Sequence, residues 1–159
     1  MNIPFTLRHK PVIVSEDYDR IDGRFAGRSD AKGLSLGLAQ WNDRGSLDIS
    51  AKVWRHTGNK WSRQSEELPL HRVLDLAILV CRAKQYFADA YRLPLLYDPA
   101  QPTIDRVPLQ GGAMNVAVAT GNERIDDDIK LFQQALSQDD ELIGERLRRL
   151  GSILRELGY

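Results

Sequence analysis

Hydrophobic and polar positions alternate along three neighbouring segments in the first half of the chain. The segments are 33–41, 47–56 and 60–66, with turn-forming Asn, Asp and Gly residues between them at 42–45 and 57–59. Alternation with a period of two is typical of β-strands, and short Asn- and Gly-containing connections are typical of hairpins. A shorter apolar piece at 11–14 predicts one earlier strand, followed by a polar loop. The pattern therefore predicts an antiparallel β-meander.

A helical period replaces the alternation after Pro69. Apolar residues then recur three and four positions apart, at Leu70, Val73, Leu74, Ala77, Val80 and Cys81. Proline is favoured in the first turn of a helix, and Pro94 disfavours helical geometry in the residue before it. We therefore expect a helix from Pro69 to about Arg92. Because apolar residues also fill its flanks, we expect a core helix covered on more than one side, with Cys81 as an inert buried thiol.

The remaining chain predicts one more strand and two helices. Four prolines between 94 and 108 predict an ordered crossing loop or an extended arm. A strand is expected at 113–120, a helix at 126–136 and a second helix from about Asp140, introduced by the capping-box pattern Ser137-Gln-Asp-Asp140. The predicted fold class is α+β: an antiparallel meander of about four to five strands packed against a long core helix, with two C-terminal helices. We expect a single domain over residues 1–159.

Composition limits the class of protein and its partners. The chain is 42% hydrophobic and 28% charged, with 22 basic and 22 acidic residues. This balance is typical of a globular protein and gives no global field of the kind that generic nucleic-acid binders use. No apolar run approaches the ~20 residues of a membrane span, and the N-terminus lacks the pattern of a signal peptide. We therefore expect a cytoplasmic protein with no membrane partner.

Charge is nevertheless distributed unevenly. The segment 44–65 holds five basic residues and one acidic residue, whereas 122–145 holds eight acidic and two basic residues. Neither common glycine-rich phosphate loop is present, and no residue set has the spacing of a zinc or calcium site. The sequence predicts no metal site and no cofactor, and no catalytic residue is identified.

The best candidate for a binding surface lies on the second and third predicted strands. Alternation places Leu47, Ile49, Ala51 and Val53 on one face, expected to be core, and Asp48, Ser50, Lys52, Trp54 and His56 on the other. A hairpin register that sets Trp61 and Arg63 beside Lys52 and Trp54 would present two indole rings flanked by cations. Such a face suits a base stacked on indole with its phosphate held by a cation. The predicted ligand-binding residues are Lys52, Trp54, His56, Trp61, Arg63, Gln64 and His71.

This face predicts a non-enzymatic binding module for a nucleotide-type anion or a short single-stranded nucleic acid. Tryptophans on adjacent strands also pack against each other or beneath a covering segment, so a purely structural role is an alternative. A second alternative is an interaction protein that forms a homodimer through the last helix. Its seam would consist of Ile143, Leu147, Leu150, Leu154 and Leu157. A third is a hydrolase of nucleotide-like substrates.

The hydrolase alternative depends on a small set of side chains near the start of the core helix. His71 and Asp75 are four residues apart and would share a helix face. With Glu66 or Glu67 and Arg63, they could form an acid–base site. The structural interpretation is that His71 and Asp75 lie on the solvated side of the helix. The two glutamates would then stabilise the first turn through the helix dipole.

Several segments resemble a small bacterial family of unknown function. They are His9-Lys-Pro-Val-Ile-Val14, the segment Ser29 to Asn42, the segment Asp48 to Thr57, and the segment Lys60 to Leu79. The resemblance extends over nearly the whole chain and implies no activity, cofactor or catalytic residue. The order of three strands and a helix is also similar to the half-unit of whirly-type folds, which bind single-stranded DNA, but topology alone does not fix function.

Overall fold

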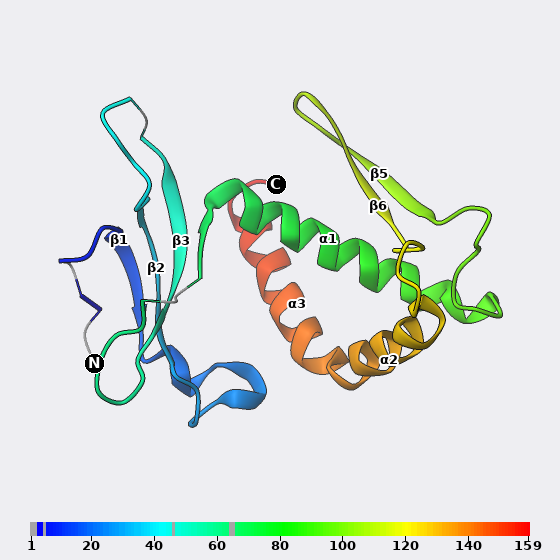
Figure 1. The fold of residues 1–159 in the computed structure, drawn as a ribbon, viewed down its shortest axis with the longest axis horizontal. Helices are drawn as coiled ribbons and strands as arrows, with labels where there is room; N and C mark the ends of the chain where they lie inside the picture. Colours follow the sequence, from blue (N-terminus) through cyan, green and yellow to red (C-terminus); the bar gives the residue numbers. More distant parts are fainter. Residues whose placement is uncertain (1–2, 5, 46, 64–65) are drawn as a thin grey trace. The chain divides into compact units, whose positions relative to one another are not determined.

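The computed structural model describes residues 3, 4, 6–45, 47–63 and 66–159 (Figure 1). The chain forms two compact units, Met1–Ala77 and Ile78–Tyr159. We call them the N-terminal and C-terminal units and describe each by itself. The fold is α+β, with a four-stranded antiparallel meander, a long helix and two C-terminal helices, as predicted. The single domain stays a prediction.

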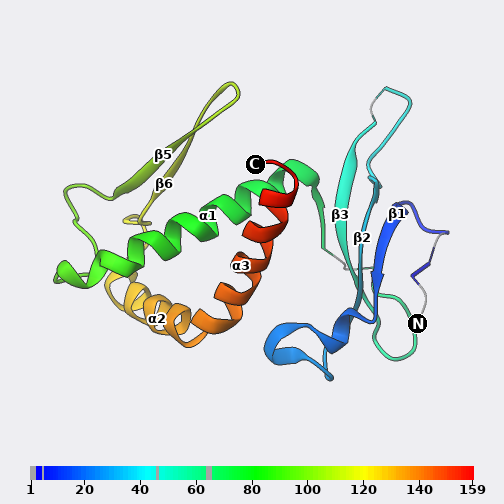
Figure 2. The same cartoon turned by 180° about the vertical axis from the view of Figure 1, so that it is seen from behind.

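The N-terminal unit contains the meander, seen from both sides in Figures 1 and 2. Its strands pair in the order β1-β2-β3-β4, and every neighbouring pair is antiparallel. The strands are β1 (Lys10–Glu16), β2 (Ala31–Leu38), β3 (Ile49–Arg55) and β4 (Glu67–Pro69). Two short 3₁₀ turns, Tyr18–Arg20 and Gly23–Phe25, occupy the polar loop between β1 and β2.

The predicted strand at 60–66 is wrong in the described part of that segment. Trp61 forms only an isolated bridge with His56, and the fourth strand begins at Glu67. The chain turns back tightly here, because Thr57 N donates to Lys60 O at 2.9 Å and Ser62 N donates to Arg55 O at 2.7 Å. The left-handed φ of 91° at Gly58 permits this turn. A local loop therefore replaces the expected edge strand.

The strand register separates the sheet into two chemically different faces. Residues opposite each other on neighbouring strands share a face, and the register pairs Ser35 with Lys52 and Lys52 with Glu67. One face, the polar face, carries Gly33, Ser35, Gly37, Ser50, Lys52, Trp54 and Glu67. The other, the aliphatic face, carries Ile13, Leu34, Leu36, Leu38, Ala51, Val53 and Leu68.

The polar face is the covered one, which reverses the prediction for the strand at 47–56. Ser50 and Trp54 are each 1% exposed and Lys52 is 8% exposed, whereas Leu36 and Leu38 remain exposed. Two residues of the N-terminal segment, Ile3 and His9, are also fully buried. A Cβ at Gly33 would lie 2.7 Å from Ile3 Cδ1, so the missing side chain at Gly33 makes room for Ile3. Covering residues from outside the strands thus decide which face is the core.

Helix α1 (Leu70–Asp89) continues into a 3₁₀ turn, Ala90–Arg92, which confirms the predicted long helix. Its expected burial is wrong. All of α1 is described, and none of its residues is buried. Cys81 is exposed, so the prediction of an inert core thiol is also wrong. Helical spacing predicts that a helix forms, but it does not tell how much of the helix surface is covered.

The C-terminal unit contains a hairpin and two helices. The hairpin joins β5 (Thr103–Leu109) to β6 (Gly112–Ala117) in a two-stranded sheet. Strand β5 corrects the expectation of a loop or arm at 94–108 from Thr103 onward, whereas the fully described segment 94–102 contains no helix or strand. Pro108 is tolerated there because a two-stranded sheet consists only of edge strands, which can lack a ladder hydrogen bond.

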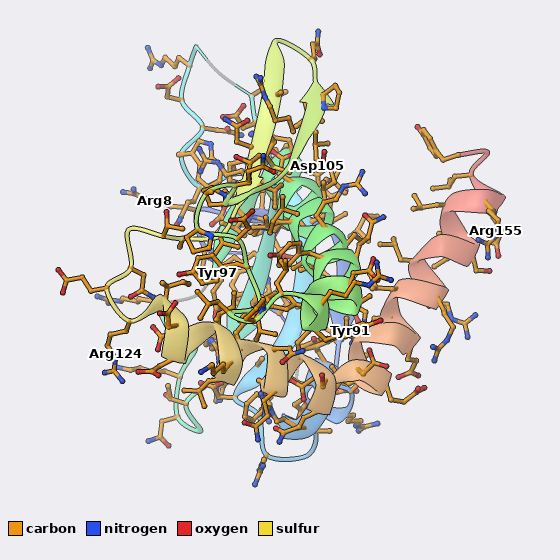
Figure 3. The ribbon with its side chains drawn as sticks, turned by 90° about the vertical axis from the view of Figure 1, so that its right-hand side faces the viewer. Arg8, Tyr91, Tyr97, Asp105, Arg124 and Arg155 are labelled. Carbon is orange, nitrogen blue, oxygen red and sulfur yellow. The ribbon has the colours of Figure 1, made fainter. Side chains whose placement is uncertain are left out.

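Helices α2 (Ile125–Gln138) and α3 (Asp140–Glu156) close the chain. Ser137 lies inside α2, so the predicted capping box before α3 is wrong. The buried Tyr97 donates its hydroxyl to Asp126 Oδ1 at 2.7 Å, which ties the segment before β5 to the start of α2. Asp105, labelled with Tyr97 in Figure 3, pairs with Arg82 Nε at 2.8 Å and ties β5 to α1. In the described part of the chain, no helix combines the length and apolarity needed to cross a bilayer.

Candidate functional site

The predicted ligand-binding residues do not form one open face. Trp54 is buried, and Trp61 is half-buried with its ring edge-on to Trp54 and to His56, at centroid distances of 6.0 and 5.1 Å. The rings therefore pack against one another, which is the structural alternative given above. Arg63 is exposed, and Gln64 lies outside the described residues.

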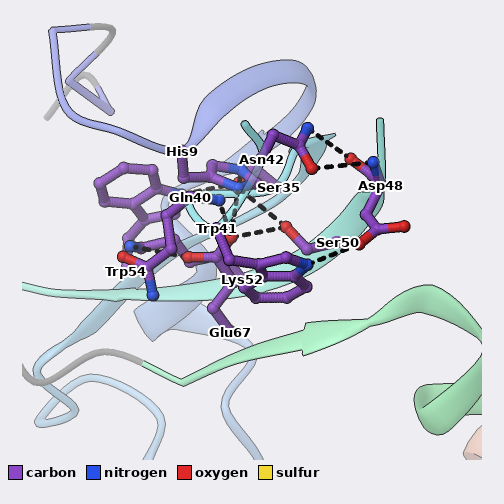
Figure 4. A network of polar contacts seen from close by, with 10 residues as sticks. All are labelled: His9, Ser35, Gln40, Trp41, Asn42, Asp48, Ser50, Lys52, Trp54 and Glu67. Carbon is purple, nitrogen blue, oxygen red and sulfur yellow. Dashed lines mark hydrogen bonds and ion pairs between the residues drawn. The ribbon is translucent and has the colours of Figure 1, made fainter. Parts of the chain in front are cut away.

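A cluster of polar side chains fills the covered side of the sheet (Figure 4). We call it the polar cluster; it consists of His9, Ser35, Ser50, Lys52, Trp54 and Glu67. Its members come from the segment before β1 and from strands β2, β3 and β4. All six side chains are nearly or completely inaccessible to solvent. Buried polar groups must find partners inside the protein, because an unsatisfied one costs free energy.

His9 lies at the centre of the polar cluster. Its Nε2 is 2.9 Å from Ser35 Oγ, and its Nδ1 is 3.0 Å from Ser50 Oγ and 3.1 Å from Glu67 Oε1. Ser35 Oγ also accepts a hydrogen bond of 2.8 Å from Trp54 Nε1. These contacts suit a neutral imidazole in which Nδ1 donates towards the carboxylate and Nε2 accepts from Ser35. Burial lowers the pKa of His9, and its contact with Glu67 offsets this only in part.

Glu67 is the principal acceptor of the polar cluster. Its Oε1 accepts from Ser50 Oγ at 2.7 Å and from the backbone N–H of Gln40 at 2.9 Å, besides His9. Burial alone would raise the pKa of Glu67, but these donors outweigh it and hold the pKa below its ordinary value. Its Oε2 accepts no hydrogen bond from any described residue and lies 3.5 Å from Lys52 Nζ, at ion-pair distance. Lys52 also lies over the Trp54 ring, 4.6 Å from its centroid.

A groove of about 780 Å³ lies beside the polar cluster, in the same unit. We call it the Trp41 groove; it is lined by Trp41, Leu47, Asp48, Glu67, Pro69, Leu70, His71, Arg72 and Leu74. His71 and Arg72 are exposed on the first turn of α1. The groove therefore brings together an indole ring, aliphatic side chains, one cationic side chain, a histidine and the carboxylates of Asp48 and Glu67.

The indole of Trp41 is held in place while part of it stays open. Its Nε1 donates to Asp48 Oδ2 at 2.8 Å, and the residue remains 39% exposed. Asn42 fixes Asp48 in turn, because Asp48 N donates to Asn42 Oδ1 at 2.8 Å and Asn42 Nδ2 donates to Asp48 O at 3.0 Å. Figure 4 shows this loop of contacts next to Glu67. The result is a preorganised aromatic surface.

Sequence reasoning names two members of the Trp41 groove as site residues, His71 for ligand binding and Glu67 only within the hydrolase alternative, and misses others. His71 was predicted, and it does line the groove. Trp41, Asp48 and Arg72 were not selected as site residues. The available signal was a tryptophan directly before an Asn-Asp-Arg-Gly turn, since loops that follow strands often carry binding residues.

The groups of the hydrolase alternative are only partly brought together. His71 and Glu67 line the same groove, but Asp75 and Arg63 do not line it. Glu66 is held by Arg55, whose guanidinium donates to both of its carboxylate oxygens. That hydrogen bond to Arg55 lowers the pKa of Glu66 below its ordinary value. The arrangement therefore offers contacts for a ligand more readily than an acid–base pair.

Comparison with known proteins places the chain in a family. It belongs to a family of unknown function, DUF6530, whose profile matches residues 1–159. No curated protein and no solved structure is significantly similar to the chain.

Proposed function

We propose that this member of the DUF6530 family is a non-enzymatic binding module for a nucleotide-type anion, and that the ligand occupies the Trp41 groove. One observation carries the proposal: the Trp41 indole is fixed by Asp48 yet part-exposed along a groove of about 780 Å³. A fixed aromatic surface favours binding because little conformational freedom is lost when a planar ring stacks on it.

The first turn of α1 supports an anionic ligand. Arg72 offers a permanent cation and His71 an imidazole, both on the groove wall. Backbone N–H groups at a helix start point outward and favour negative charge nearby. Trp41 thus takes the stacking role first assigned to Trp54 and Trp61. A single nucleotide fits this set better than a long strand, because a nucleic-acid tract requires many phosphate contacts.

Titration of the tryptophan fluorescence with ATP, GTP and an oligothymidine tests the proposal. We expect saturable quenching by at least one of the three, and weaker binding in Trp41→Phe by about tenfold, because stacking of a base on an aromatic ring contributes about 1–3 kcal/mol. Arg72→Gln should also weaken binding and reduce its dependence on salt.

Trp61→Phe is the matched control. Trp61 lies in the same unit, where it pairs with His56 just after β3, but it does not line the groove. It should retain the affinity of the wild type. If quenching survives in Trp41→Phe and disappears in Trp61→Phe, the ligand binds at the Trp54 and Trp61 surface predicted from the sequence and not in the Trp41 groove. If none of the three compounds quenches the tryptophan fluorescence, the proposed binding function is excluded.

Self-association through α3 is a second candidate function. Four apolar side chains in the C-terminal half of α3 and just beyond it are exposed, namely Leu150, Ile153, Leu154 and Leu157. Three of them belong to the predicted seam. An exposed apolar stripe on an amphipathic helix is typical of a helix that packs against a partner. This observation supports a homodimer formed by the C-terminal helix.

A further inference from the structure

The polar cluster and the Trp41 groove share one residue and one hydrogen bond. Glu67 belongs to the cluster and also lines the groove. Its Oε1 accepts the backbone N–H of Gln40, the residue directly before Trp41. The carboxylate therefore holds the backbone at the base of the indole, while Asp48 holds the far end of the ring. The position of Trp41 depends on both contacts.

Two strands, β3 and β4, contribute the charged groups that surround His9 in the polar cluster. The charged groups that face His9 are Glu67 from β4 and Lys52 from β3; the remaining neighbours, Ser35, Ser50 and Trp54, are neutral. The geometry suits a neutral imidazole, because Ser35 Oγ accepts from Trp54 Nε1 and its own hydrogen then finds an acceptor in His9 Nε2.

A proton on His9 Nε2 would disturb this arrangement. Nε2 would become a donor, so Ser35 Oγ would have to accept on its second lone pair and turn its own hydrogen away, although Ser35 is only 5% exposed. A second positive charge would also form near Lys52. Glu67 would be drawn towards the imidazolium, and its contact with Gln40 would change as a result.

We propose that His9 and Glu67 are positioning residues for the Trp41 groove: through the Gln40 amide they hold the Trp41 indole in its binding position, and protonation of His9 releases it. The part that concerns a ligand rests on the proposed function. The positioning of Trp41 does not, because it can be followed in the free protein.

Fluorine NMR of protein containing fluorotryptophan tests the positioning directly. The Trp41 resonance is assigned by its loss in Trp41→Phe and then followed from about pH 7.5 to about pH 5. We expect a transition of that resonance with a midpoint below the ordinary histidine value. His9→Gln should abolish the transition. His71→Gln is the matched control, because His71 lines the groove but lies outside the cluster, and it should keep the transition.

If His9→Gln does not fold, the Trp54 and Trp61 resonances will lose their chemical-shift dispersion. A second variant tests the proposal in that case. Ser35→Ala removes the hydroxyl that donates to neutral His9, so His9 should protonate more easily and the transition should move to higher pH. A transition that is missing in the wild type, unmoved in Ser35→Ala, or abolished only by His71→Gln overturns the proposal.

Affinity for ATP in the His71→Gln background tests the consequence for binding. Wild-type His9 and His9→Gln are compared at the same pH, which cancels the titration of the ligand itself. We expect binding to weaken at least threefold more on acidification when His9 is present. If ATP does not bind, the comparison is made with GTP or the oligothymidine; if none of the three binds, the proposed ligand fails, whereas the Trp41 resonance still decides whether the cluster positions the indole. Equal affinities with a clear Trp41 transition would overturn only the link to binding.

Discussion

Lys52 and Glu67 place opposite charges in a part of the N-terminal unit that excludes solvent. Their side chains are 8% and 1% exposed, and Nζ and Oε2 are 3.5 Å apart. Removing two ions from water costs several kcal/mol each, and their attraction repays that cost only when other contacts satisfy the remaining polar atoms. Here the Trp54 ring and the donors to Oε1 supply those contacts. Neither charge is tolerable without the other.

Lys52→Met should therefore destabilise the protein by about 3 kcal/mol, because it leaves the Glu67 carboxylate buried without its cation. The matched control is Lys32→Met on β2, whose ion pair with Asp19 is 2.8 Å long but partly exposed. It should cost less than about 1 kcal/mol. Urea unfolding of both variants measures the difference, and equal losses would show that Lys52 is not paired in the native state.

Stability should fall on mild acidification because of His9. Its folded-state pKa lies below the ordinary value of 6.5, so the unfolded chain takes up a proton first. The contribution of His9 is complete above about pH 6.5 and decreases as the pH falls from there towards the folded-state pKa. Glu67, whose pKa is also lowered, adds a further loss only below its ordinary value of 4.5.

Urea unfolding at about pH 7.5 and at about pH 5.5 isolates the histidine contribution. His9→Gln should flatten the pH dependence in this window, whereas His71→Gln should leave it unchanged. A wild-type protein that gains stability on acidification would contradict the assigned neutral imidazole.

At the scale of elements, the sequence predicts strands and helices well and their covered faces poorly. The meander, the long helix from Leu70 and the two C-terminal helices follow from local periodicity, which depends only on neighbouring residues. Which face of β3 is buried depends on Ile3 and His9, more than forty residues away along the chain. Alternation predicts that the aliphatic face is the core. The polar face can be buried instead because its side chains satisfy one another's hydrogen bonds.

Contacts between residues distant in the sequence also explain why the candidate site lies elsewhere than the sequence predicts. Trp54 and Trp61 attracted the prediction because they lie among basic residues, yet neighbouring strands and loops bring them against each other. The only local signal at Trp41 is the turn that follows it, and only folding brings it beside His71 and Arg72. The ligand class stays a prediction from residue types, whereas the location of the groove could not be predicted from them.

Substitutions on the two faces of the sheet should differ in cost. Ile3→Ala removes a side chain that is 1% exposed and should cost about 3 kcal/mol. Leu36→Ala removes one that is 42% exposed on the aliphatic face and should cost about 1 kcal/mol. Thermal unfolding of the two variants compares them under the same conditions. A larger loss for Leu36→Ala would mean that a further surface covers the aliphatic face.

At the scale of the whole molecule, we expect apolar surface, rather than net charge, to govern any association between copies of the chain. No global repulsion keeps copies apart, because basic and acidic residues are equal in number. The exposed stripe of α3 is then available to another copy. This is the scale at which the homodimer can be tested, since sedimentation reports on the assembly as a whole.

We expect sedimentation equilibrium to show a dimer that Leu154→Glu together with Leu157→Glu converts to a monomer. The control is Leu131→Glu on α2, an exposed leucine outside the seam, which should leave the dimer intact. A wild-type protein that stays monomeric at high concentration would exclude this candidate.

The polar cluster also affects how the family can diverge. Its donors run in one direction, from the Trp54 indole through Ser35 and His9 to Glu67, so a change at any member leaves its neighbour with a donor or acceptor unused. Single replacements are therefore penalised, while compensating pairs are tolerated. Related sequences should exchange these positions jointly, as one inherited block drawn from four separate stretches of the chain.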